Sequence, residues 1–167
     1  PYDNSAFRKA LFDKLYRVKF IEDLNNNVII LNGQKVFKIS MGKDYFNDEL
    51  IEKAIDEKLV LVHSQTKPKG RSDTSQAEIF TKQMKIGDYF YLTHSNKNLK
   101  LIGRITSVSQ PASFNDMYDD GWLERSFEPL FPSQKLGGFN GSGKYWLPNT
   151  NTTCWSINEE ELKEENE

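Results

Sequence analysis

The sequence contains a single cysteine, Cys154, and only two histidines, His63 and His94. An internal disulfide is therefore excluded, and a structural zinc site made of cysteine and histidine would lack ligands. Long hydrophobic runs are also absent: the longest, such as Leu59 to Val62, span four residues, whereas a membrane helix needs about 20. No apolar block follows a basic N-terminus, as it would in a signal peptide. These absences predict a soluble, cytoplasmic protein whose fold depends on packing alone.

Length and charge indicate one domain with an acidic end. The 167 residues fit one core. Residues 159–167 hold six of the 24 acidic residues, whereas residues 1–158 carry 21 basic and 18 acidic ones. We therefore expect one mildly basic domain over residues 1–158, followed by an acidic tail or the start of a linker. Because the chain begins with Pro1 rather than methionine, we interpret it as a piece of a longer protein with another module beyond Glu167.

The spacing of apolar residues predicts an α+β fold. Helices are expected over residues 5–24, inside an N-terminal segment 1–26, over 47–58 with Asn47 as cap, and from the capping box Ser75–Glu78 to Met84. Candidate strands lie at 28–31, 36–40, 59–63, 89–93, 99–108, 122–130, 145–147 and 153–157, and residues 110–121 are expected to form a loop. We expect a mixed or antiparallel β-barrel of about six to seven strands with about three flanking helices.

Motifs for catalysis are incomplete. The segment from Gly138 to Lys144 comes within one residue of a phosphate-binding P-loop. The next position must be serine or threonine to hold Mg²⁺ and must open a helix, but Tyr145 stands there and Pro148 follows. No acidic pair suits a metal-dependent nuclease, and Cys154 has no histidine in a nucleophile context. We therefore expect no enzymatic activity, no metal and no cofactor.

Four short motifs follow one another in a fixed order from Val36 onward. They are Phe37–Ser40 (F-K-I-S), Met84–Asp88 (M-K-I-G-D), Leu101–Ile105 (L-I-G-R-I) and Gly121–Arg125 (G-W-L-E-R). In type and order these motifs resemble the EVE domain of the PUA-like superfamily, a relative of the YTH readers, over residues 36 to about 130. The K-x-S-x-G pattern from Lys38 to Gly42 is similar to that of the N-terminal DNA-recognition modules of McrB-type modification-dependent restriction proteins.

The resemblance implies a pocket for a modified base, such as a methylated one, that is flipped out of a DNA duplex. Flipping costs a few kcal/mol, which stacking on aromatic rings would offset. Carried over by position, the pocket is expected to contain Ser40, Met41, Gly42, Tyr45, Phe46, His63, Ser64 and Trp122. A core role for Trp122 and turn roles for Ser40 and Gly42 remain alternatives. YTH domains and many EVE domains carry a tryptophan at the end of the second strand, where this chain reads Leu61-Val62-His63-Ser64. A full three-sided aromatic cage is therefore not expected.

Five basic residues are candidates for contacts to the DNA backbone. They are Lys67, Lys69, Arg71, Lys82 and Lys85. Basic loops contact phosphates without reading sequence, although a solvated surface loop has the same composition.

The resemblance also implies partners: double-stranded DNA with a modified base, a GTP-hydrolysing AAA+ motor in the same full-length protein, and a nuclease subunit, together serving antiviral defence. Two other functions stay open, a YTH-like reader of modified RNA and a protein-interaction adaptor with exposed aromatic residues. An uncharacterised hydrolase is the weakest alternative, because no catalytic set is present.

Overall fold

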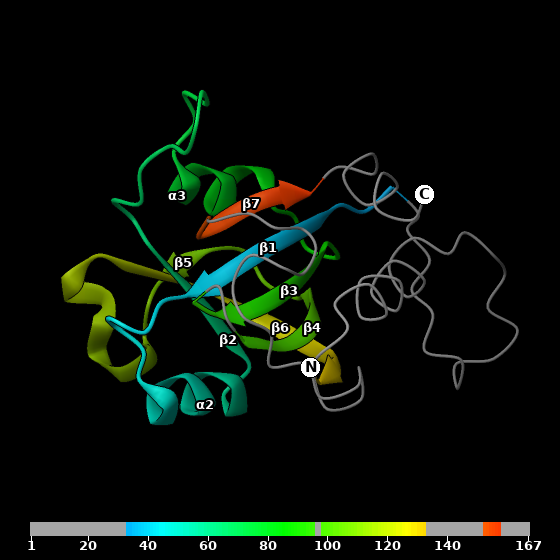
Figure 1. The fold of residues 1–167 in the computed structure, drawn as a ribbon. Helices are drawn as coiled ribbons and strands as arrows, with labels where there is room; N and C mark the ends of the chain where they lie inside the picture. The colour runs from blue at the N-terminus through cyan, green and yellow to red at the C-terminus, as the bar shows by residue number, and fades with distance from the viewer. Residues whose placement is uncertain (1–32, 96–97, 133–151, 158–167) are drawn as a thin grey trace, which may run out of the picture.

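The computed structural model describes residues 33–95, 98–132 and 152–157 (Figure 1). Several predicted features lie outside these ranges: the helix at 5–24, the strands at 28–31 and 145–147, the P-loop-like segment at 138–145 and the acidic end at 159–167. Among the helices within these ranges, none combines the length and the apolar character needed to cross a membrane.

The described strands form one curled, mixed sheet (Figure 1). Along the sheet they are ordered β2-β6-β4-β3-β1-β7, and β5 pairs with β6. β1 and β3 run parallel, and the other pairs are antiparallel. The expected barrel-like α+β class and the β3–β4 hairpin are thereby confirmed. The bounds are β1 (Val36–Met41), β2 (Leu59–His63), β3 (Tyr89–His94), β4 (Asn98–Ile105), β5 (Gln110–Pro111), β6 (Trp122–Pro132) and β7 (Cys154–Ile157).

The long strand β6 makes the sheet curl. Its first half pairs with β2, starting with His63 opposite Trp122, and its second half pairs with β4. A register shift between Ile102 and Gly103 marks a bulge, which bends a strand and increases its twist. Gly103 is required at this bend, because a Cβ there would lie 2.8 Å from a carbon of the Phe90 ring.

Helical segments cover the curled sheet. They are α2 (Asp48–Asp56), α3 (Gln76–Glu78), its π-helical continuation η2 (Ile79–Gln83) and the 3₁₀ segment η3 (Phe114–Asp120). α2 and α3 lie on opposite sides of the strands in Figure 1. The predicted caps are present: Leu50 N donates to Asn47 Oδ1 at 2.8 Å, and Glu78 N donates to Ser75 Oγ at 3.0 Å.

Residues 110–121 are more ordered than the sequence indicates. This stretch, which we predicted as loop, contains β5 and η3. Neither leaves a periodic pattern, because β5 has two residues and η3 is interrupted by the positive φ angles of Asn115 (48°) and Asp116 (54°). The helix count therefore also differs from the expected three.

The hydrophobic core lies on one face of β1 and its neighbours. Phe37, Ile39 and Met41 alternate toward this core, so Lys38 and Ser40 occupy the other face of the strand. Cys154, opposite Ile39 on β7, is a free buried thiol whose pKa is raised by burial. It is therefore a packing residue rather than a nucleophile.

Candidate functional site

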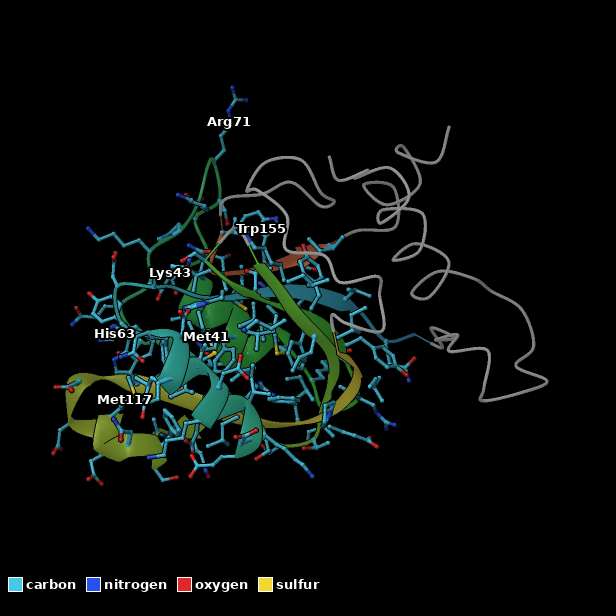
Figure 2. The ribbon with its side chains drawn as sticks, turned by 60° about the horizontal axis from the view of Figure 1, so that its bottom comes forward. Met41, Lys43, His63, Arg71, Met117 and Trp155 are labelled. Carbon is cyan, nitrogen blue, oxygen red and sulfur yellow. The ribbon has the colours of Figure 1, made fainter. Side chains whose placement is uncertain are left out.

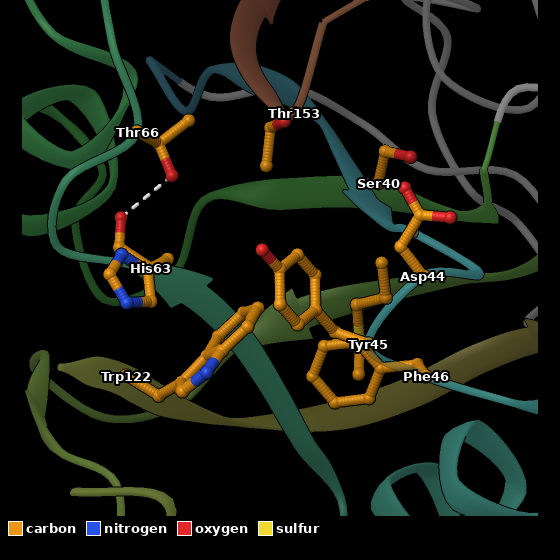
Figure 3. Close-up of a pocket in the computed structure, with 10 residues that line it drawn as sticks. Ser40, Asp44, Tyr45, Phe46, His63, Thr66, Trp122 and Thr153 are labelled. Carbon is orange, nitrogen blue, oxygen red and sulfur yellow. Dashed lines mark hydrogen bonds between the residues drawn. The ribbon is translucent and has the colours of Figure 1, made fainter. Parts of the chain in front are cut away.

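A pocket of about 200 Å³ lies where β1 and β2 end and β6 begins (Figure 3). This volume is below the roughly 300 to 1,000 Å³ of pockets for drug-sized ligands, so it suits a single small ring system. Seven of the eight residues expected from the sequence line it, and Ser64 does not. Asp44, Thr66 and Thr153 line it as well, although the sequence analysis did not identify them. The lining residues are Ser40, Met41, Gly42, Asp44, Tyr45, Phe46, His63, Thr66, Trp122 and Thr153.

Trp122 is surrounded by aromatic rings on one side of this pocket. The ring centroids of Phe46 and His63 each lie 5.1 Å from that of Trp122, and the centroid of Tyr45 lies 5.4 Å away. All three contacts are edge-to-face, with interplanar angles of 67° to 89°. Only 8% of Trp122 is exposed, so most of its surface serves packing and a small part is left for a ligand.

Tyr45 is the aromatic residue that is open to a ligand. Its side chain is 68% exposed and stands beside Trp122 (Figure 3). The turn that carries it is closed by Gly42, whose carbonyl oxygen accepts from Tyr45 N at 3.3 Å and from Phe46 N at 2.9 Å. The largest available stacking surface is therefore on Tyr45.

His63 contributes a ring to the pocket and no free hydrogen-bonding atom. Its Nδ1 accepts from Gln65 N at 3.1 Å, so the proton lies on Nε2, which donates to the carbonyl oxygen of Asp120 at 2.6 Å. Its own carbonyl oxygen accepts from Thr66 Oγ1 at 2.7 Å, the dashed line in Figure 3. His63 therefore contributes its ring to the pocket wall, and hydrogen bonds to a ligand would have to come from other residues.

The entry into β6 explains why Ser64 lies outside the pocket. Gly121 has a φ of +86°, and a Cβ there would lie 3.0 Å from Ser64 Oγ and 3.2 Å from His63 Nε2. Ser64 N donates to the Gly121 carbonyl oxygen at 2.9 Å. Ser64 therefore ties the end of β2 to the residue before Trp122, which is a positioning role.

A buried carboxylate, Glu124, holds the segment that precedes β6. It accepts from Gln110 Nε2 at 3.0 Å, from Ser113 Oγ at 2.9 Å and from Phe114 N at 3.1 Å. Desolvation by burial opposes ionisation, but these hydrogen bonds outweigh it and lower the pKa of Glu124. The carboxylate thus stays ionised at neutral pH and fastens the chain two residues from Trp122.

The opposite wall of the pocket is polar. Ser40 Oγ donates to the Ser95 carbonyl oxygen at 3.0 Å, and Ser40 N donates to the Thr153 carbonyl oxygen at 2.7 Å. Asp44 stands next to Ser40 (Figure 3) and is the one acidic residue among those that line the pocket. A carboxylate here can accept a hydrogen bond from an amino group of a planar ligand.

His94 supports the aromatic wall from behind. This buried histidine, 1% exposed, shares a 2.6 Å hydrogen bond between its Nε2 and the carbonyl oxygen of Phe46. Its Nδ1 lies 3.5 Å from Asp48 Oδ1 at the start of α2. The segment that carries Tyr45 and Phe46 is therefore anchored to β3.

The five candidate backbone contacts occupy different places. Lys67, Lys69 and Arg71 lie between β2 and α3, and Arg71 projects from the tip of that loop (Figure 2). Lys82 pairs with Glu78 at 3.5 Å on the helical segment, and Lys85 follows η2. Of the five, Lys69 alone lines either the first pocket or a second pocket next to it, and it belongs to the second. Any role of these residues in DNA binding stays a prediction.

Within residues 33–95, 98–132 and 152–157, no group of three or more histidine, cysteine, aspartate or glutamate residues is placed to hold a metal ion.

No family model matches the sequence, and no curated protein is significantly similar to it. Among solved structures, the chain is similar to a Pseudomonas putida protein (15% identity, TM-score 0.39, 77% of this chain and 95% of that one). It is also similar to a hypothetical protein from Leishmania major (9% identity, TM-score 0.41, 80% of this chain and 95% of that one). A third similar structure is a Rhodopseudomonas palustris protein (11% identity, TM-score 0.42, 77% of this chain and 88% of that one). Likenesses this distant carry no argument about function.

Proposed function

We propose that this chain is an EVE-like recognition domain that binds a modified base, flipped out of duplex DNA, in the pocket beside Tyr45 and Trp122. The observation that supports it most is that residues from three distant stretches, around Ser40–Phe46, His63 and Trp122, meet around one small pocket. Aromatic rings line one side of this pocket and polar groups the other, as binding of a planar heterocycle requires.

The energetics of base binding are compatible with these side chains. A flipped base loses a few kcal/mol of stacking and pairing, and each aromatic ring on which it stacks returns about 1 to 3 kcal/mol. Tyr45, which is 68% exposed, provides most of the surface on which a base can stack, and the exposed 8% of Trp122 adds to this surface. If the modification weakens base pairing, flipping the modified base costs less free energy than flipping an unmodified one. This difference would favour binding of the modified base.

The small positive net charge of residues 1–158 is consistent with weak binding to the phosphate backbone of DNA. Residues 1–158 carry only three more basic than acidic residues, so affinity for unmodified DNA should be modest and fall steeply with salt. Such a domain would rely on its base pocket for selectivity. The same proposal assigns the chain to a McrB-type restriction protein, in which an AAA+ GTPase motor and a nuclease subunit would act on the DNA that this domain selects.

The direct test is to measure the affinity of the protein for a panel of short duplexes of one sequence at fixed low salt. The duplexes contain one N6-methyladenine, one 5-methylcytosine or no modification, and a single-stranded RNA with N6-methyladenosine is added. We expect tighter binding to one of the modified duplexes than to the unmodified duplex. Preference for the RNA would indicate a YTH-like reader instead, and equal binding to every probe would contradict base recognition.

Replacing Tyr45 by alanine should remove this preference. The loss of one stacking ring is expected to weaken binding of the preferred duplex by about 5- to 150-fold and to leave binding of the unmodified duplex almost unchanged. Because Tyr45 is 68% exposed, thermal unfolding should change little. Fluorescence anisotropy of both duplexes, with thermal unfolding measured in parallel, gives all three quantities.

Two variants control this experiment. Tyr45→Phe keeps the ring and should bind like the wild type. Ile86 is also a large exposed apolar residue (59%) but does not line the pocket, so Ile86→Ala should leave the preference intact. Full preference in Tyr45→Ala, or an equal loss in Ile86→Ala, would rule out stacking on Tyr45.

A further inference from the structure

A second pocket, of about 230 Å³, adjoins the first. The two share Ser40, Gly42 and Thr153, and the second is completed by Lys69, Gln76, Ser95 and Thr152. Its lining differs in character, because none of these seven residues is aromatic or acidic. Asp44, the acidic residue of the first pocket, does not reach it. A ligand that spans both pockets would thus meet aromatic rings at one end and hydroxyl groups and a lysine at the other.

The loop that carries Lys69 is fastened to the sheet. Gln76, only 5% exposed, donates from Nε2 to the Lys67 carbonyl oxygen at 3.0 Å. Its Oε1 accepts from Thr153 N at 2.6 Å and from Cys154 N at 3.1 Å. One side chain therefore connects the loop, the start of α3 and the start of β7. Lys69, two residues after Lys67, is held close to the pocket by this connection.

A buried lysine lies on the same strand as Ser40, one of the residues that line this pocket. Lys38 is fully buried and shares a face of β1 with Ser40, two residues further along. Burial, and to a smaller extent the nearby charge of Lys69, lower the pKa of Lys38 to about 7. Two amino groups thus repel each other beside a pocket whose lining contains no acidic residue. An anion in the pocket would relieve this repulsion and favour the protonated form of Lys38.

A buried hydroxyl group also lies next to Ser40. Thr93 on β3 is opposite Ser40 in the parallel β1–β3 pair. Its Oγ1 is buried and has no hydrogen-bond partner among the described residues. A buried hydroxyl without a partner is uncommon in folded proteins. It adds a polar atom to the face of the sheet that carries Ser40 and Lys38.

We propose that this second pocket is a phosphate subsite, in which Lys69 binds the phosphate next to the nucleotide whose base occupies the first pocket. Lys38 contributes positive charge from the face of β1 that carries Ser40, and Asp44, which lines only the first pocket, disfavours a phosphate there. The subsite thereby favours a nucleotide within a strand over a free base. It also determines the orientation in which the nucleotide occupies the two pockets. Its place beside the base depends on the proposed function, whereas binding of phosphate there does not.

Titration with inorganic phosphate tests the subsite without any base. In nuclear magnetic resonance spectra of the full chain, we expect saturable shifts of Ser40, Gly42 and Thr153 and an upward change in the pKa of Lys38. Lys69→Gln should weaken phosphate binding about tenfold or more, because a hydrogen bond to a charged group is lost. Lys67→Gln removes the same charge from the same loop outside the pocket and should weaken it less than about twofold.

Two outcomes would overturn the subsite: equal weakening of phosphate binding in Lys67→Gln and Lys69→Gln, or shifts spread over the surface with no change in the pKa of Lys38.

A second experiment tests whether the phosphate subsite and the base pocket bind the same nucleotide. In the preferred duplex, a neutral methylphosphonate replaces the phosphate on one or the other side of the modified nucleotide. One of the two replacements should weaken wild-type binding about tenfold and leave the binding of Lys69→Gln unaltered. If no duplex is preferred but phosphate still binds at Lys69, base recognition fails and the subsite stands.

Discussion

Replacing Arg125 by methionine is expected to lower the free energy of unfolding by about 3 to 5 kcal/mol. Arg125 is 2% exposed, and its guanidinium group donates to four backbone carbonyl oxygens. The acceptors are those of Phe80 (2.8 Å), Ser107 (2.9 Å), Thr81 (3.3 Å) and Met84 (2.7 Å). Three of them belong to η2 and the residues beside it, so one side chain fastens this segment and the residues after β4 to β6.

Methionine fills similar space but donates no hydrogen bond. Replacing both members of a buried ion pair by apolar residues can be neutral, because both charges leave the interior. The acceptors of Arg125 are backbone atoms, so the substitution does not remove them. In the variant these carbonyl oxygens stay buried and have lost their donor. Urea unfolding at neutral pH measures the difference. Arg125→Lys keeps the positive charge but loses the planar guanidinium group with its several donors, so it should recover only a small part of the lost free energy of unfolding.

Arg104 supplies a matched control for this substitution. It lies on β4, a neighbouring strand, and is exposed. Arg104→Met makes the same chemical change and should stay within about 0.5 kcal/mol of the wild type. If both variants lose similar stability, the hydrogen bonds of Arg125 to the four carbonyl oxygens do not carry the effect.

The sequence predicted the parts of the fold that have local signals. Asn47 and the apolar spacing behind it place α2 within two residues of its observed end, since caps and periodicity act within one helix. The β3–β4 hairpin follows from two apolar runs separated by polar residues. Residues expected at strand ends, such as Ser40, His63 and Trp122, do meet around one pocket. His63 and Trp122 are paired on β2 and β6, whereas β1 is separated from them along the sheet and approaches them only because the sheet is curled.

Buried charges could not be predicted in this way. Lys38 alternates with apolar residues, as solvent-facing residues of strands do, and Glu124 and Arg125 are consecutive charged residues, yet all three are at most 2% exposed. Their burial depends on partners that are not neighbours in the sequence, for example Phe80 and Met84 for Arg125. Hydropathy contains no information about such partners. The second pocket went unrecognised for the same reason, because Lys69, Gln76 and Thr153 meet only in the folded chain.

The structure also changes the role expected of Trp122. The sequence left two alternatives, a stacking platform or a core residue. Trp122 belongs to the main hydrophobic cluster and is 8% exposed, so its packing with Tyr45, Phe46 and His63 dominates. Under the proposed function, stacking on a base therefore falls mainly to Tyr45, which is 68% exposed. A substitution at Trp122 should therefore affect folding before it affects recognition.

Trp122→Ala should lower the free energy of unfolding by about 3 to 5 kcal/mol, because a large buried ring is lost and its three edge-to-face partners face a cavity. Trp122→Phe keeps an aromatic ring and should lose distinctly less. Thermal unfolding and binding of the preferred duplex are measured on the same samples. At a temperature where Trp122→Ala is still folded, its selectivity should fall because Tyr45 has lost its neighbour. A variant that unfolds like the wild type but has lost selectivity would instead assign Trp122 to direct ligand contact. In that case the ring must turn its face to the pocket when the base enters, and packing is its secondary role.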